Sequence, residues 1–560
     1  MKKLICIMLA VLLLTGCAGG AAPEAAELKA NIQGEEITYQ AWEKDGLPTE
    51  GSYYLTREVE IAQAVTVSGE LNLHLNGHSI VAAHDTIMGH MFVIPAGSRM
   101  TVYDTPVEDP FASFDNEEPE EFELELVTGT IVSNRSFSGK MTISSMFKVE
   151  GELVMAGGHI DASPINLEDR ANGSAINVRS GGHFDMVGGV ITGGTTWRFA
   201  VEKPLAETET SALSGTPATT TPDATTTTPD GTAPTETTAP VETTAPAVTE
   251  PVIEIANETL GRGGAVYIDK GASATMSGGT IWKGSACEGG NFYVAGDEEG
   301  SGQLTILGGV LLYGEAVMAG GNVYVAGKMD MSDGTMLWGR SYCDGGNLFL
   351  SGQLNITGGK LEGGACDVNA KGYKYGGNIA VNGINATVSI TNTEILDGTA
   401  ACKESHGGNI SIVRYGAKEF EVGEGTKIIG GLGHRGGNVY VGHFAKDIPL
   451  ENTDYVFTKV EMSGGTTTYR GANMCSDTKD TTRPIQVTFN DCNMIVDNAG
   501  ERSLAIGAGA KDVSQCIIVI NGGTFTGGEI HIYGSSTVTS NGTKFVDCPV
   551  GGTGIYTENP

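Results

Sequence analysis

Short segments in which apolar and polar residues alternate run along most of the chain from about residue 51. In residues 71–81, Leu71, Leu73 and Leu75 alternate with Asn72, His74 and Asn76. This alternation places the leucines on one face of a strand. Glycines separate such segments, and the repeated units show no helical periodicity. The pattern predicts an all-β chain built from short strands and tight turns.

A Gly-Gly-Asn triplet followed by an apolar strand recurs in the second half of the chain. The triplets begin at Gly289, Gly320, Gly345, Gly376, Gly407 and Gly436, and a variant begins at Gly263. Consecutive triplets are 25 to 31 residues apart, a spacing typical of repeat proteins. One unit cannot bury its apolar face alone, so neighbouring units must stack. We expect two or three strands per coil and a solenoid of about 16 coils, about 75 Å long.

Residues 203–252 break this pattern. They repeat Thr, Pro and Ala, a composition typical of disordered, extended segments. We predict that this segment is an insertion in one turn of a continuous solenoid, between N-terminal coils at 36–202 and C-terminal coils at 253–560. A linker between two separate β domains is the alternative.

The first residues resemble an export signal. Two lysines precede an apolar run that is too short for a membrane span. Leu14-Thr15-Gly16-Cys17 resembles the bacterial lipobox. The resemblance implies that a signal peptide, residues 1–16, is removed, that Cys17 carries lipid, and that residues 17–35 form a tether. It implies a protein on the extracellular face of the bacterial envelope, held to the membrane by this anchor only; an ordinary secretory signal is the alternative.

The formal net charge of −33 argues against nucleic acid as a partner and against docking on an anionic membrane. An acidic stretch at 104–126 is expected to be a solvated loop, with a calcium site as the alternative. No cofactor is expected.

Ten cysteines are present, of which Cys6 leaves with the signal and Cys17 is the lipid site. Cys287, Cys343, Cys366 and Cys402 fall in one loop zone, where disulfides and buried thiols are both open alternatives. No cysteine pair has zinc-site spacing, so no metal site is expected.

The strand units resemble the right-handed parallel β-helix of the pectate-lyase-like superfamily. The segments 71–80, 304–311 and 354–361 carry this resemblance, and the Gly-Gly-Asn units resemble repeats of polymorphic outer-membrane and adhesin-type surface proteins. The resemblance implies a single-stranded right-handed parallel β-helix. This fold hosts lyases, hydrolases, epimerases and non-catalytic adhesins, so it does not specify an activity.

Catalytic patterns of this superfamily are largely missing from the sequence. Of the polygalacturonase pattern only Asn452-Thr453-Asp454 matches, and there is no Asp-Asp pair or Gly-His-Gly. The clustered aspartates and arginine of pectate lyases are not visible either. These absences favour a non-catalytic protein.

Aligning the repeats produces three columns of residues. The first contains Asn291, Asn322, Asn347, Asn378, Asn409 and Asn438, which we expect to form a structural amide ladder. The second points outward by alternation and contains Tyr267, Tyr293, Tyr324 and Phe349, with Trp282 and Trp338 in nearby loops. An exposed aromatic stripe suits the CH-rich faces of sugars, so these six are the candidate ligand-binding residues. Alternatively the rings only stack on one another or lie under the long insertion.

The third column precedes the glycine pair and contains Arg262, Glu288, Asp344, Tyr375, His406 and Arg435. We expect these residues to be exposed turn positions that serve solubility. The alternative is a groove in which Glu288 and Asp344 act as the two carboxyl groups of an inverting glycosidase.

Taken together, the sequence predicts a non-catalytic surface lipoprotein that binds a polysaccharide or another surface glycan, as an adhesin or in polysaccharide capture. A polysaccharide lyase or glycoside hydrolase is the alternative, and a structural spacer is a third possibility.

Overall fold

The computed structural model describes residues 28–560 except 84–88, 106–128, 134–142, 164, 166–171, 197–260, 367–373, 401–404, 444–453, 479–483, 497–500 and 508–514. Every helix or strand in these described ranges is a β-strand, as the alternation predicts. Within them no helix is long and apolar enough to cross a membrane. The signal peptide, Cys17, Cys402, the segment 203–252 and nearly all of the acidic stretch lie outside the described residues.

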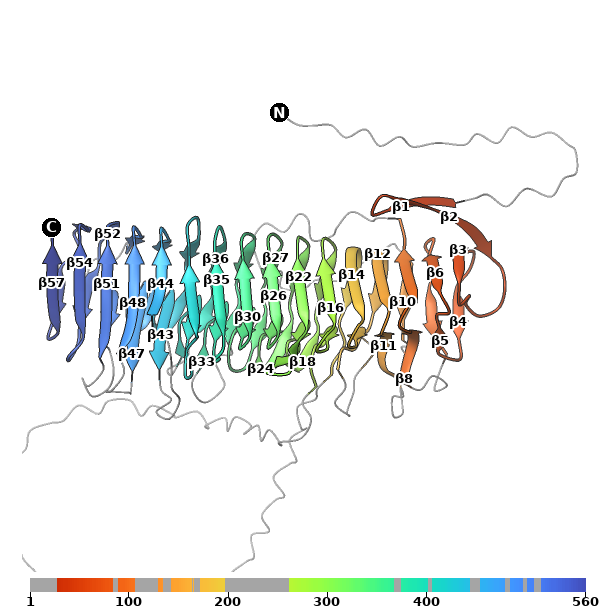
Figure 1. Ribbon diagram of the computed structural model, residues 1–560, viewed down its shortest axis with the longest axis horizontal. Coiled ribbons are helices and arrows are strands. Elements are labelled where there is room, and N and C mark those ends of the chain that lie inside the picture. Colours follow the sequence, from red (N-terminus) through yellow and green to blue (C-terminus); the bar gives the residue numbers. More distant parts are fainter. Residues whose placement is uncertain are drawn as a thin grey trace, which may run out of the picture. The chain divides into compact units, whose positions relative to one another are not determined.

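The repeating unit is a coil of parallel-paired strands. One coil runs through β15 (Val266–Ile268), β16 (Ser273–Met276), β17 (Thr280–Trp282) and β18 (Ser285–Glu288), and β19 (Phe292–Val294) opens the next. Val266 of β15 pairs with Phe292 of β19 in parallel register. Figure 1 shows the strands of successive coils side by side. The predicted all-β parallel β-helix is confirmed.

The coils generate three long sheets. A 31-stranded sheet takes two strands from most coils and includes the long strands β12 (Glu152–Asp161) and β14 (His183–Thr192). A 15-stranded sheet takes one strand per coil: β5 (Val65–Thr66), β8 (Gly89–Ile94), β11 (Ile143–Val149), β13 (Ile176–Val178), β15, β19, β25 (Val323–Val325), β29 (Leu348–Leu350), β34 (Ile379–Val381), β39 (Ile410–Ile412), β43 (Val439–His443), β47 (Met474–Thr478), β50 (Arg502–Ile506), β53 (Glu529–Ile532) and β56 (Val550–Gly552).

A nine-stranded sheet supplies a fourth strand in the coils between residues 285 and 470, where we had expected two or three. Its members are β18, β24 (Glu315–Ala319), β28 (Arg340–Ser341), β32 (Ala365–Cys366), β33 (Lys374–Tyr375), β37 (Thr399–Ala400), β38 (Ser405–His406), β42 (Leu432–Arg435) and β46 (Thr466–Arg470). These strands are short and lack clear apolar alternation, so the sequence pattern does not reveal them.

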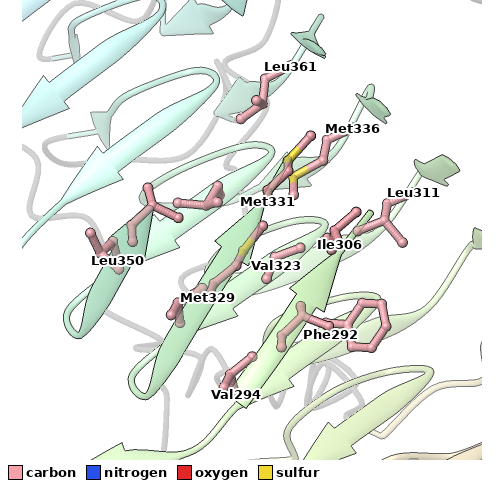
Figure 2. Close-up of a cluster of buried hydrophobic side chains, with 14 of the residues drawn as sticks. Phe292, Val294, Ile306, Leu311, Val323, Met329, Met331, Met336, Leu350 and Leu361 are labelled. Atoms are coloured by element: carbon pink, nitrogen blue, oxygen red, sulfur yellow. The ribbon is translucent and has the colours of Figure 1, made fainter. Parts of the chain in front are cut away.

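The inward side chains of all coils form one continuous apolar core. Leu304, Ile306, Met329, Met331, Leu354 and Ile356 are buried in it, as the alternation predicts. Figure 2 shows Phe292, Met331 and Leu350 from different strands pointing into this shared interior. Burying a side chain of this size contributes about 1.5–3 kcal/mol, and each coil gains it only because a neighbour covers its open face.

The strand stacks continue from one side of residues 197–260 to the other. Ile176 of β13 pairs with Val266 of β15, and β14 pairs with both β16 and β17. The described residues on the two sides of this stretch belong to one compact unit. This pairing supports an insertion within one solenoid over a linker between two domains.

An antiparallel hairpin covers part of the N-terminal coils. It consists of β1 (Leu28–Ile32) and β2 (Glu35–Trp42). Tyr39 of β2 is buried and meets the His74 ring edge-on, with ring centroids 5.4 Å apart. His74, which alternation points outward, is therefore buried as well.

The asparagine column forms the predicted ladder. The Asn322 amide accepts from Asn291 (2.8 Å) and donates to Asn347 (2.7 Å), and the same contact repeats along the column. The ladder continues to Asn473, which ends a Gly471-Ala472-Asn473 variant of the triplet.

The two positions of each triplet require glycine for different structural reasons. Gly289 adopts a φ of +69°, which other residues rarely adopt, and a Cβ on Gly290 would lie 2.1 Å from the Gly321 carbonyl oxygen. The first glycine provides the turn and the second lets the neighbouring coil approach.

Candidate functional site

The outer face of the 15-stranded sheet carries the second column of residues. Its rings stack from coil to coil: the centroids of Tyr267 and Tyr293 are 5.5 Å apart, those of Tyr293 and Tyr324 are 5.1 Å apart, and those of Tyr324 and Phe349 are 4.7 Å apart. The four residues occupy equivalent positions in the register. The structure therefore brings them together as one stack.

The stack is covered, which contradicts the expected exposed stripe. Tyr267, Tyr293 and Phe349 are only 7%, 4% and 6% exposed, and Tyr324 is partly buried. The Arg262 guanidinium lies over the Tyr293 ring, 4.8 Å from its centroid. Burial raises the pKa of Tyr293 well above its usual value.

The rings of the stack pack in two apolar clusters. Phe349 packs with Ala319 of β24 and Tyr375 of β33, both in the fourth strand of their coils, whereas Tyr267 and Tyr293 pack with Ala295. Alternation alone predicts that the outward side is exposed to solvent, because the fourth strand leaves no such pattern in the sequence. These rings are consequently packing elements in the described structure.

The two tryptophans lie in a different cluster. Trp282, at the end of β17, and Trp338, which directly follows β27 (Thr335–Leu337), are buried with Leu312 and Leu337 in a cluster separate from the tyrosine stack. Trp338 adopts a φ of 48°, and a Cβ on Gly363 would lie 2.4 Å from its Cδ1 atom. Gly363 thus makes room for the indole. As candidate ligand-binding residues in nearby loops, the two tryptophans were expected to be accessible, whereas Trp282 is 5% and Trp338 6% exposed.

The third column is stacked in register but is largely buried. Arg262 pairs with Glu288, Asp344 with Tyr375, and Tyr375 with His406 along the backbone. Arg262 Nε donates to Glu288 Oε2 at 2.8 Å. Glu288, Asp344, Tyr375 and His406 are all buried, so the expectation of exposed residues serving solubility is wrong for them.

Asp344 occupies the middle of this column. Arg414 Nη2 lies 3.8 Å from its Oδ2 atom, whereas Oδ1 has no hydrogen-bond partner among the described residues. Burial raises the pKa of Asp344 to about 6, against the opposing positive charges of Arg414 and Lys374. A carboxyl group with such a pKa can exchange protons near neutral pH.

A half-buried group of rings and cations around one exposed tyrosine lies further along the column, from Arg435 onward. Tyr469 is 49% exposed and stacks on His434, with ring centroids 5.1 Å apart and an interplanar angle of 14°. Arg470 lies over both Tyr469 and Tyr533, 4.5 Å from each centroid. We call His434, Arg435, Tyr469, Arg470, Arg502 and Tyr533 the tyrosine–arginine platform.

Further contacts hold the platform in place. Arg435 Nη1 donates to Asp477 Oδ2 at 2.8 Å, and Arg502 Nη1 donates to the Tyr533 hydroxyl. Arg435 and Arg470 are paired across neighbouring strands. Tyr469 is not among the residues predicted from the sequence, because the triplet that follows it, Gly471-Ala472-Asn473, has alanine at the second position. This variant triplet is the signal that aligns Tyr469 with the other coils.

The cysteines are thiols in the described residues. Cys287 and Cys366 are buried, Cys343 is partly buried, and no described cysteine forms a disulfide. Within the described ranges no group of three or more His, Cys, Asp or Glu is arranged to hold a metal ion. No protein-family model, no curated protein and no solved structure matches this chain.

Proposed function

We propose that this protein is a surface-anchored β-helix that binds glycans or other surface polymers without cleaving them. The observation that carries the proposal is the tyrosine–arginine platform, where an exposed ring stands beside several hydrogen-bond donors. The covered tyrosine stack no longer supports it.

The platform has the chemistry of a sugar-binding surface. A tyrosine ring offers a flat apolar area with a polar tip, which suits the CH-rich face of a sugar. The Arg470 and Arg502 guanidinium groups and the His434 ring surround Tyr469 and Tyr533, and can donate hydrogen bonds to hydroxyl or carboxylate oxygens. A stack of coils also gives a polymer an extended surface along which to lie.

The proposed location rests on the lipobox resemblance. A lipid on Cys17 would hold the solenoid at the outer face of the envelope, where polymeric glycans are available. Membership of the pectate-lyase-like superfamily is likewise proposed, since the parallel β-helix itself does not identify a family.

A glycan array with the full chain tests the binding proposal. Tyr469→Ala should weaken binding to any glycan that the parent binds by about fivefold, because the loss of one stacked ring costs about 1 kcal/mol. Tyr415→Ala is the matched control, since Tyr415 is 41% exposed and lies outside the platform. Absence of any bound glycan, or an equal loss in both variants, would contradict the proposal.

A second candidate function is cleavage of a polysaccharide, and Asp344 favours it. A buried carboxyl group with a pKa of about 6 suits general acid or base catalysis. Release of reducing ends by the parent, abolished in Asp344→Asn but retained in Tyr469→Ala, would establish an enzyme and overturn the non-catalytic proposal.

A further inference from the structure

A lysine and a cysteine from neighbouring coils are in contact beside Asp344. Lys374 of β33 is 4% exposed, and its Nζ atom lies 3.6 Å from the Sγ atom of Cys343. Cys343 follows β28 and is partly accessible to solvent. The two residues are 31 positions apart in the chain, and the stacking of the coils brings them together.

This environment is unusual for a lysine. A buried ammonium group ordinarily pairs with a carboxylate, because an isolated buried charge is costly. Among the described residues no carboxylate oxygen lies within 4.0 Å of Lys374 Nζ, although Asp344 is near enough to interact electrostatically. Nζ contacts the Cys343 thiol at 3.6 Å, so the amine and the sulfur are close enough for a bridging atom to join them.

We propose that Lys374 and Cys343 form a covalent nitrogen–oxygen–sulfur bridge when dissolved dioxygen oxidises the pair. The Lys374 ammonium group first releases one proton to solvent. One N–H bond of the resulting amine and the S–H bond then break, and one oxygen atom joins Nζ to Sγ. The second oxygen atom leaves as water with the two released hydrogens. Nitrogen and sulfur each give up two electrons, and dioxygen accepts all four.

A disulfide is the competing product, and the surroundings of Cys366 disfavour it. Cys366 is buried, and its Sγ atom lies 3.5 Å from the Tyr375 carbonyl oxygen and 3.4 Å from that of Gly376. Burial holds the pKa of the Cys366 thiol far above its usual value, so reactive thiolate is scarce. Burial also raises the pKa of Cys343, but the positive charge of Lys374 opposes this.

The bridge would clamp one coil to the next on the outer face. It would close a long loop covalently, which restricts the unfolded chain as a disulfide does. An extracellular protein is exposed to dioxygen and is not kept reduced by cytosolic thiols. Formation of the bridge depends only on the Lys374–Cys343 contact, so its test is independent of the proposed glycan binding.

Mass spectrometry of the full chain tests the proposal. After exposure to air and digestion, the peptides that contain Cys343 and Lys374 should appear linked, with a combined mass increased by one oxygen and decreased by two hydrogens. Dithiothreitol should separate them. An anaerobically purified sample should contain only the separate peptides.

Three variants sharpen this experiment. Cys343→Ser and Lys374→Arg should each lose the linked species, and Lys374→Arg retains the positive charge. Cys366→Ser should still form the linked species, because Cys366 takes no part in the bridge. An unmodified pair in air, an oxidised Cys343 that is not linked, or a disulfide to Cys343 would each overturn the proposal, and all three outcomes can be read from the parent protein alone.

Discussion

At the scale of single residues, the Gly-Gly-Asn triplet is explained by backbone geometry and amide pairing. The first glycine takes a left-handed conformation, the second allows a close approach between coils, and the asparagine joins one coil to the next. The repeat is visible in the sequence because the same turn, close approach and amide contact recur from coil to coil.

The asparagine ladder yields a prediction about stability. Asn347 is fully buried, accepts from Gly339 N (2.9 Å) and from Asn322, and donates to the Glu362 carbonyl oxygen (2.9 Å) and to Asn378. Asn347→Ala leaves these buried partners unsatisfied, so we expect a loss of about 3 kcal/mol or more. Denaturant unfolding followed by circular dichroism measures it. Asn355→Ala, at an exposed position, should cost less than about 0.5 kcal/mol, and equal losses would refute the ladder's role.

Asp344 yields a prediction about pH. Its pKa is about 6 in the folded chain against an ordinary value of 3.8, so the folded state disfavours the ionised form. This lowers the free energy of unfolding by an amount that depends on pH. The loss is absent well below pH 3.8, where Asp344 is protonated in both the folded and the unfolded chain, and it grows as the pH rises toward 6. Above pH 6 the loss should reach about 3 kcal/mol.

The variant Asp344→Asn isolates this contribution. Its stability relative to the parent should increase between pH 4 and pH 6 and stay constant above that range. Thermal unfolding of both proteins across this range measures the difference. A relative stability that does not change with pH would show that the carboxyl group is not buried as described.

At the scale of elements, the strands that alternate strongly were predictable and the fourth strand was not. Leu304, Ile306 and Met329 show a period of two because one side faces an apolar core. Residues 285–288 and their equivalents contribute a short strand with apolar and polar residues on both sides, so no period emerges. Because the fourth strand cannot be recognised from the sequence pattern, the tyrosine stack was expected to be exposed.

The covered stack predicts a structural role for Tyr293. Tyr293→Ala removes a buried ring that contacts Tyr267 and Tyr324 and lies under Arg262. We expect a loss of about 3–5 kcal/mol, as for other buried aromatic residues. A melting curve compared with that of Tyr469→Ala, where the ring is half exposed, provides the check. Similar melting temperatures for the two variants would mean that the stack is open to solvent.

At the scale of the whole molecule, repetition made the fold predictable and left the function open. Stacked coils require similar residues at equivalent positions. The sequence therefore repeats for structural reasons, and the repeat carries no information about a ligand. The tyrosine–arginine platform departs from that repetition: Tyr469 belongs to a coil whose triplet contains alanine, and Arg470 and Tyr533 come from coils that are far apart in sequence. A site of this kind forms only where particular coils lie next to one another, and the strand register in the structure is needed to identify those coils.

The junction at residues 197–260 carries the last prediction. Limited proteolysis should cut first within 203–252, because a Thr- and Pro-rich composition with few apolar residues favours a segment open to proteases. The two fragments should remain together during native gel filtration, since β13 pairs with β15 and β14 pairs with β16 and β17 across the junction. The buried Ile176, Phe184 and Val266 lie in the same core cluster, so separation would expose it to water. Denaturant should then release two fragments of unequal size, and fragments that separate without denaturant would mean that the coils on the two sides of the junction do not share a core.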